Sequence, residues 1–163
     1  MPEAFVSNLS DNTRSSMADL LNERLADAID LTLAVKQAHW NLKGSSFIGI
    51  HELLDDVADR MREHVDTIAE RCVILGGQAR GTSQVVSSET SLEAYPVEAQ
   101  NQRVHVDALK TRFMSFGAKL REGIDAAGEA GDEDTADLFT EVSRVVDKDA
   151  WFIGAHNETG ADA

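Results

Sequence analysis

The chain has 163 residues, 42% of them hydrophobic, so it is long enough to bury one substantial core and has the composition of a globular protein. Fifteen basic residues against 29 acidic ones give a formal net charge of −14, which argues against general binding to nucleic acid or anionic membranes. No apolar run approaches the roughly 18 residues that span a bilayer, and the N-terminus lacks the pattern of a signal peptide. We therefore expect a cytoplasmic protein with no membrane partner.

The first half of the chain predicts a helical hairpin. One helix can begin near Ser10-Asp11-Asn12, which are good N-caps, and run to about Leu42, where Gly44 can stop it. A second helix can start after Ser46 and end before Gly76. Its apolar residues recur at spacings of three and four and form one stripe: Leu54, Val57, Met61, Val65, Ile68, Cys72 and Leu75. The place of the only cysteine in this stripe favours a buried core residue over a redox sensor.

The second half predicts another hairpin. The long connection from Gly76 to Pro96 exceeds what antiparallel neighbours need, so it is expected to cross the length of a bundle. Its Leu92–Tyr95 segment is expected to form a short helix. A third long helix is predicted from about Val97 to Ala127 and a fourth from about Thr135 to His156, with a glycine-rich acidic turn between them.

Two helical hairpins joined by a long crossover predict an all-α, ferritin-like four-helix bundle. We place the bundle domain at residues 10–156. It is preceded by a flexible N-terminal tail, residues 1–9, and followed by a short acidic C-terminal tail, residues 157–163.

Five potential metal ligands lie near the end of the first helix and along the second: His39, His51, Asp55, Asp66 and Glu70. Imidazole and carboxylate are the ligands expected for iron, manganese or zinc. At about 100° per residue, the four on the second helix share one face, well separated from its apolar stripe. Asp55 and Asp66 lie eleven residues apart, roughly 16 Å along the axis, so bonds of about 2 Å cannot join them to one ion.

A second copy of the chain, antiparallel across a two-fold axis, removes this difficulty. His51 and Asp55 of one copy then face Asp66 and Glu70 of the other, and symmetry generates two sites per dimer. His39 joins the first pair because a short turn returns the chain past it.

Taken singly, each of these residues has an ordinary structural explanation. A lone His39 on an apolar helix face is more often a core histidine, and carboxylates near Arg60, Arg62 and Arg71 are usually a solvated, charge-balanced face. The complete set is far more specific than its members. The Glu-x-x-His pair of a di-iron site within one bundle is absent, and His51–Asp55 lacks the second histidine of a zinc protease.

Several segments resemble the signature of the Dps miniferritins (DNA-binding proteins from starved cells). They are Lys36–Gly44 with Phe47, His51–Asp55, Asp66–Arg71, Ala94–Pro96, Asp134–Asp137 and Asp147–Phe152. The resemblance spans nearly the whole chain, from about Ser10 to His156, and includes the complete ligand motif. It implies a hollow shell of twelve copies that oxidises Fe(II) with hydrogen peroxide, oxygen serving less well, and stores ferric mineral inside.

The resemblance also implies roles for single residues. The ferroxidase centre would take its iron ligands from two copies, with His39, His51 and Asp55 from one and Asp66 and Glu70 from the other. Glu70 would be the principal bridging or anchoring carboxylate, and Asp66 a ligand to the more weakly held iron or an organiser.

Three acids near the start of the fourth helix would line a three-fold pore through which Fe(II) enters: Asp132, Asp137 and Glu141. Capping of that helix is the alternative explanation. Trp40 would lie near the iron centre and trap stray oxidising equivalents, although an aromatic packed at the dimer interface is equally compatible. Trp151 is expected to be a packing residue.

Direct DNA binding is not expected, because residues 1–11 contain no Lys or Arg and the last seven residues carry only acids among their charged side chains. Protection of DNA would then be chemical, by removal of iron and peroxide, with association with the nucleoid left open. The rival interpretation is an architectural DNA-compacting protein whose metal site is structural or holds another metal. Zinc or manganese can replace iron in this ligand set.

Overall fold

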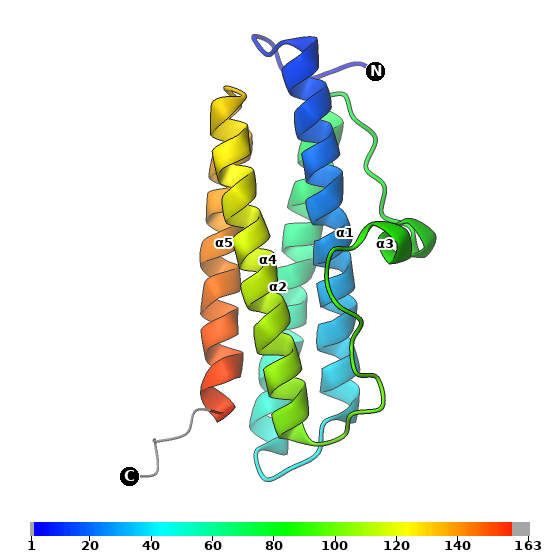
Figure 1. The fold of residues 1–163 in the computed structure, drawn as a ribbon, viewed down its shortest axis with the longest axis vertical. Helices are drawn as coiled ribbons and strands as arrows, with labels where there is room; N and C mark the ends of the chain where they lie inside the picture. The colour runs from blue at the N-terminus through cyan, green and yellow to red at the C-terminus, as the bar shows by residue number, and fades with distance from the viewer. Residues whose placement is uncertain (1, 158–163) are drawn as a thin grey trace.

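The computed structural model describes residues 2–157, and these residues form an all-helical bundle (Figure 1). Its elements are α1 (Asp11–Asn41), α2 (Phe47–Ile74), α3 (Ser83–Glu89), α4 (Gln102–Glu129), α5 (Glu133–Gly154) and a short 3-10 helix (Ala155–Asn157). Between Pro2 and Asn157 the only strand-like contact is an isolated bridge of Lys43 with Asn101. The predicted four-helix bundle is confirmed, and no helix in this range is long and apolar enough to cross a membrane.

The first hairpin forms where the capping residues predict it. The side chain of Ser10 accepts a hydrogen bond from the backbone N–H of Thr13 (3.0 Å) and so satisfies a free donor at the start of α1. The helix ends at Asn41, one residue before the predicted end, and α2 begins after Ser46. A turn of five residues, 42–46, therefore joins two long antiparallel helices.

The core lies between the four long helices. On α2 the predicted stripe is buried at Leu54, Val57, Met61, Ile68, Cys72 and Leu75, and Val65 is half-buried. The facing helices contribute other fully buried side chains: Leu21, Leu25 and Leu31 from α1, Phe113 and Phe116 from α4, and Phe139 from α5. Because the apolar stripe of α2 packs into this core, the opposite face of the helix is available for other contacts.

Burial raises the pKa of the Cys72 thiol, and Asn22 is its hydrogen-bond partner (Nδ2 to Sγ, 3.4 Å). A thiol with a raised pKa forms little of the reactive thiolate at pH 7. We therefore expect native protein to react with Ellman's reagent far more slowly than denatured protein. Equal rates in the two states would contradict the core role of Cys72 and favour a redox sensor.

Two predicted boundaries in the crossover are wrong. The short helix lies at Ser83–Glu89, whereas Leu92–Tyr95 forms no helix. Pro96 disfavours helical backbone in the residue before it. The backbone N–H groups of residues 91 and 92 donate hydrogen bonds to side chains and not to helical carbonyls. The third long helix starts at Gln102 instead of Val97, because the side chain of Asn101 accepts a hydrogen bond from the N–H of Arg103 (2.8 Å).

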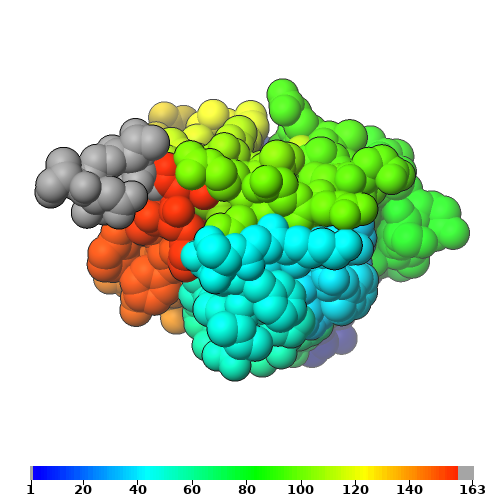
Figure 2. Space-filling view, turned by 90° about the horizontal axis from the view of Figure 1, so that it is seen from below, coloured from blue at the N-terminus to red at the C-terminus, as the bar shows by residue number. Residues whose placement is uncertain are grey.

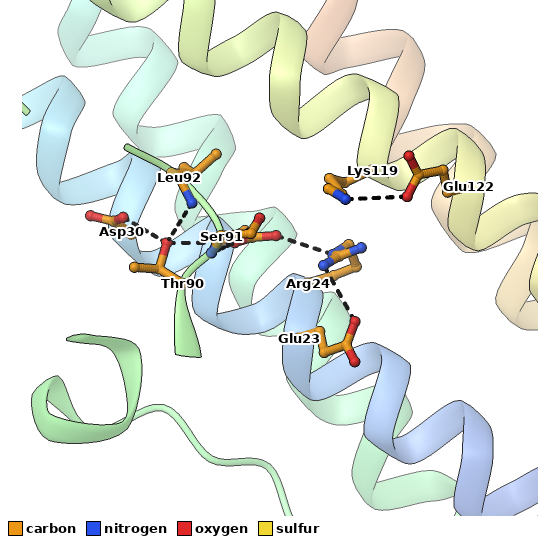
Figure 3. A network of polar contacts seen from close by, with 9 residues as sticks. Glu23, Arg24, Asp30, Thr90, Ser91, Leu92, Lys119 and Glu122 are labelled. Carbon is orange, nitrogen blue, oxygen red and sulfur yellow. Dashed lines mark hydrogen bonds and ion pairs between the residues drawn. The ribbon is translucent and has the colours of Figure 1, made fainter. Parts of the chain in front are cut away.

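A buried polar cluster anchors the crossover to α1 (Figure 3). Arg24 and Asp27 of α1 lie 3.2 Å apart (Nε to Oδ2) and are both buried. The other oxygen of Asp27 accepts hydrogen bonds from the N–H (2.7 Å) and hydroxyl (2.9 Å) of Ser91, and Asp30 accepts one from Thr90 (2.7 Å). These bonds replace the backbone pairing that an irregular segment lacks.

Removing one partner of this cluster should destabilise the fold. Asp27→Ala removes the buried carboxylate beside the guanidinium of Arg24, which keeps only the exposed Glu23 at 3.5 Å, and it removes the acceptor of two Ser91 hydrogen bonds. We therefore expect a loss of about 3–5 kcal/mol in the free energy of unfolding. Asp30→Ala, the matched control, removes one hydrogen bond and should cost about 0.5–1.5 kcal/mol. Urea denaturation measures both, and equal losses would contradict the anchoring role of Asp27.

The segment before α1 contacts the bundle. The N–H of Phe5 donates to the carbonyl of Ile74 (2.8 Å), and Val6 and Leu9 pack against the core. The predicted domain boundaries and the flexibility of residues 1–9 stay predictions. Of the predicted C-terminal tail, residues 158–163 lie outside the described residues.

Candidate metal centre

Two histidines are held together by the turn between α1 and α2. His39 lies in the last turn of α1 and His51 in the first turns of α2, and their rings stack with centroids 3.7 Å apart. Nδ1 of His39 donates to the backbone carbonyl of His51 (2.7 Å), and Nδ1 of His51 donates to that of His39 (2.8 Å). A carbonyl only accepts, so in the neutral form of each ring the proton sits on Nδ1 and Nε2 keeps a lone pair available for a metal.

Asp55 lies one helical turn beyond His51, and its side chain is exposed. Its Oδ1 is 3.8 Å from Nε2 of His39 and 2.7 Å from the ammonium of Lys36. The hydrogen bond from Lys36 lowers the pKa of Asp55, so the carboxylate is ionised and already paired with a cation. Lys36, whose ammonium also lies 5.9 Å from the ring centre of Trp40, was not singled out from the sequence.

Asp66 and Glu70 lie further along α2, both exposed. Among residues 2–157 of one copy, no three potential ligands come close enough to hold a metal ion. The structure thus brings His39, His51 and Asp55 to one end of the first hairpin and does not bring the other two carboxylates to them. This separation agrees with the eleven residues between Asp55 and Asp66, which place them too far apart along α2 to bind one ion. Completion of the site by a second copy stays a prediction.

The three arginines near these carboxylates pair elsewhere. Arg60 binds Asp149 of α5 (2.7 Å), Arg62 binds Asp59 (2.7 Å) and Arg71 binds Asp132 (2.7 Å). These three arginines therefore do not pair with the ligand carboxylates among the described residues, whereas the alternative of a solvated, charge-balanced face is untested. Within residues 2–157, Asp66 and Glu70 enter no ion pair.

Exposed apolar residues surround the ligand face. A hollow of 390 Å³ next to Glu70 is lined by Ala69, Val73, Ile74 and Ala79. Large exposed side chains on α1 and α2 extend this surface: Leu33, Trp40, Phe47, Ile48, Val73 and Ile74. Apolar side chains gathered on one surface are typical of a protein–protein contact. Trp40, exposed over 67% of its surface, belongs to this set, and its role near iron stays a prediction.

The candidate pore acids differ in environment. Asp137 and Glu141 are exposed on α5, but Asp132 is only 2% exposed. Its oxygens accept hydrogen bonds from Arg71 (2.7 Å) and from the N–H (3.1 Å) and hydroxyl (2.6 Å) of Thr135. Asp132 is thus the N-cap of α5 and a buried ion-pair partner, in line with the capping alternative, and its burial argues against the pore role expected for it.

Comparisons with known proteins identify the family to which this fold belongs. The family model described as "Ferritin-like domain" matches residues 18–162. The DNA protection during starvation protein of Agrobacterium fabrum is 50% identical over 149 residues, covering 91% of this chain and 92% of the relative. That of Mycolicibacterium smegmatis is 32% identical, covering 98% and 86%.

The chain belongs to the Dps family. A solved structure of Mycobacterium smegmatis Dps superposes with a TM-score of 0.93 at 31% identity, covering 98% of this chain and 96% of that one. The identity and the fold match extend over the whole bundle, so this Dps chain shares the family architecture from α1 to α5.

Lys36 should compete with metal at Asp55. Replacing it with methionine keeps much of the apolar stem but removes the ammonium, so we expect the affinity for Zn(II), used as a redox-inert probe, to rise by about two- to fivefold. The matched control is Lys43→Met, because the ammonium of Lys43 contacts Gln100 and none of the candidate ligands. Calorimetric titration measures both, and weaker binding by Lys36→Met would show that the ammonium supports the site instead.

Proposed function

We propose that this Dps protein is a ferroxidase and iron store whose reaction centres form between two copies. Each centre would take His39, His51 and Asp55 from one copy and Asp66 and Glu70 from the other, with two centres per two-fold interface. The observation that carries the proposal is the reciprocal pairing of the two histidines through Nδ1, which leaves both Nε2 atoms free for a metal, that of His39 lying 3.8 Å from the carboxylate of Asp55.

Fe(II) is the substrate, and hydrogen peroxide the preferred oxidant. Two Fe(II) give up one electron each, and peroxide takes both electrons with two protons to form two waters, so no hydroxyl radical is released. Neutral imidazoles and ionised carboxylates suit both Fe(II) and Fe(III), and the carboxylates offset the added charge of the oxidised metal. Zinc or manganese can occupy the same ligands without this reaction.

Storage follows if twelve copies close into a hollow shell around the ferric product. The family membership supports this assembly and the role in DNA protection that the relatives' names state. Asp137 and Glu141, exposed near the start of α5, would attract Fe(II) to a three-fold pore. Removing both Fe(II) and peroxide would protect DNA in the cytoplasm without contact.

Iron oxidation tests the site. With peroxide supplied anaerobically, His39→Ala and Glu70→Ala should each slow Fe(II) oxidation by more than about 10-fold, since even partners of metal ligands contribute 10–100-fold. Glu122→Ala, an exposed acid on α4, is the matched control and should leave the rate unchanged. Wild-type rates in both ligand variants would overturn the site assignment. Repeating the assay with oxygen measures the oxidant preference.

Mixing the two variants tests whether two copies share the site. When His39→Ala and Glu70→Ala chains are refolded together, each mixed dimer has one centre with every ligand intact and one lacking both. Random pairing makes half of the dimers mixed, so about one quarter of the wild-type centres should recover. Absence of recovery, with mixed dimers present by mass spectrometry, would show that each site lies within one copy.

The rival function, DNA compaction, requires cations that this surface lacks. At −14 per chain, we expect no gel shift of double-stranded DNA at physiological salt without divalent cations. Tight binding under these conditions would favour the architectural function. Loss of that binding with rising salt, at a steep slope, would identify phosphate contacts as its source.

A further inference from the structure

The turn between α1 and α2, residues 42–46, is irregular backbone on which the pairing of the two histidines depends. His39 lies four residues before Lys43, and His51 lies five residues after Ser46. An irregular segment lacks the hydrogen bonds that a helix gives its own backbone and needs partners from elsewhere. Ser46, the residue directly before α2, does not cap that helix with its side chain. The turn is therefore held by groups outside the first hairpin.

The start of α4 supplies these partners. The N–H of Lys43 donates to the carbonyl of Gln100 (2.7 Å), and the carbonyl of Lys43 accepts from the N–H of Gln102 (2.9 Å). The side-chain Oε1 of Gln102 also accepts a hydrogen bond from the N–H of Ser46 (2.9 Å). Figure 1 shows the turn and the start of α4 at the same end of the bundle, and Figure 2, seen from that end, shows the two segments against each other. Gln102 thus binds the turn near both of its ends.

Gly44 leaves room for the Gln102 side chain. The three atoms that a Cβ at position 44 would meet first all belong to this side chain, and the Cβ would overlap its amide group. A larger residue at position 44 would therefore push the amide away from the N–H of Ser46. The glycine and the glutamine fit each other as a pair.

The segment that carries Gln102 is itself fixed to the bundle. His105, in the first turn of α4, is fully buried. Its Nε2 donates to the carbonyl of Ala99 (2.9 Å), and its Nδ1 accepts from the hydroxyl of Tyr95 (2.7 Å). These bonds tie the residues before Gln102 to the buried side of α4. A fixed segment of this kind restrains the turn instead of moving with it.

We infer that Gln102 is a positioning residue for the metal centre, because its side chain, packed against Gly44, holds the turn that keeps the rings of His39 and His51 paired. This inference rests on the proposed function, since only a metal centre at these histidines uses the paired geometry. Within residues 2–157, Gln102 makes no hydrogen bond to any candidate ligand, so it acts through the backbone of the turn. Without this bond the turn is freer to move, and the metal must then bind ligands that are less well ordered beforehand.

Metal binding to the assembled protein tests the inference, with Zn(II) as the calorimetric probe and Co(II) as the spectroscopic one. Gln102→Met keeps the length of the side chain but loses the acceptor. The affinity for Zn(II) should fall about three- to tenfold, less than the 10–100-fold loss typical of a direct partner of a ligand. The visible bands of bound Co(II), which report coordination geometry, should change as well. Gln102→Glu, which keeps an acceptor oxygen, should restore both the affinity and the spectrum.

Asn101→Ala is the matched control. The side chain of Asn101 accepts a hydrogen bond from the N–H of Arg103 (2.8 Å), within α4 and away from the turn. This variant should keep the wild-type affinity and spectrum. A loss equal to that of Gln102→Met would show that any loosening at the start of α4 weakens the site, and would overturn the inference. Circular dichroism confirms that each variant is folded.

Gly44→Ala tests the same contact from the other side. In the wild-type background the added methyl group displaces the Gln102 amide, so the affinity for Zn(II) should fall as it does in Gln102→Met. In a Gln102→Ala background the methyl group has room, and Gly44→Ala should cause little further loss. Equal losses in the two backgrounds would show that the two residues act independently and would also overturn the inference.

The ligand variants separate this inference from the proposed function. If His39→Ala and Glu70→Ala lose Zn(II) binding while Gln102→Met keeps the wild-type affinity and spectrum, the role of Gln102 is wrong and the proposed centre stands. If His39→Ala and Glu70→Ala bind Zn(II) as tightly as wild type, the proposed centre is wrong, and the role of Gln102 is wrong with it.

Discussion

Two reciprocal hydrogen bonds, each from a histidine ring to the backbone of the other histidine, set the geometry on which the candidate centre depends. They span the junction of α1 and α2, so the five-residue turn between these helices fixes ring position and tautomer together. A turn of another length would change the relative rotation of the helices and separate the rings. The ligands are therefore oriented before any metal arrives, which reduces the entropic cost of binding.

Helix α2 has two faces with different roles, and the proposed chemistry depends on this division. One side of α2 completes the core of its own bundle, and the other carries carboxylates that a single copy cannot bring together. Burial of the first side stabilises the fold independently of metal, unlike a small metal-dependent domain. The centre proposed on the second side would exist only in the assembled protein, so folding and catalytic competence would be separate steps.

The sequence predicts the long helices well because capping residues and apolar periodicity are local signals. It also predicts which ligands share a face of α2, since this follows from helix geometry alone. It does not predict the short helix at Ser83–Glu89, the pairing of Arg71 with Asp132, or the ammonium of Lys36 beside Asp55. Each of these depends on contacts between residues distant in sequence, for which local patterns carry no information.

The ammonium of Lys36 has a consequence for the order of events. If two copies meet at the ligand face, they bring together six carboxylates and four histidines, ten potential ligands in all. Lys36 supplies one positive charge per copy at this face, held by Asp55. The protein thus carries an internal counter-ion, and in the proposed centre an incoming Fe(II) would displace this ammonium from Asp55. Asp55 would then have a cationic partner both before and after iron binds, so two copies would be able to assemble before iron arrives.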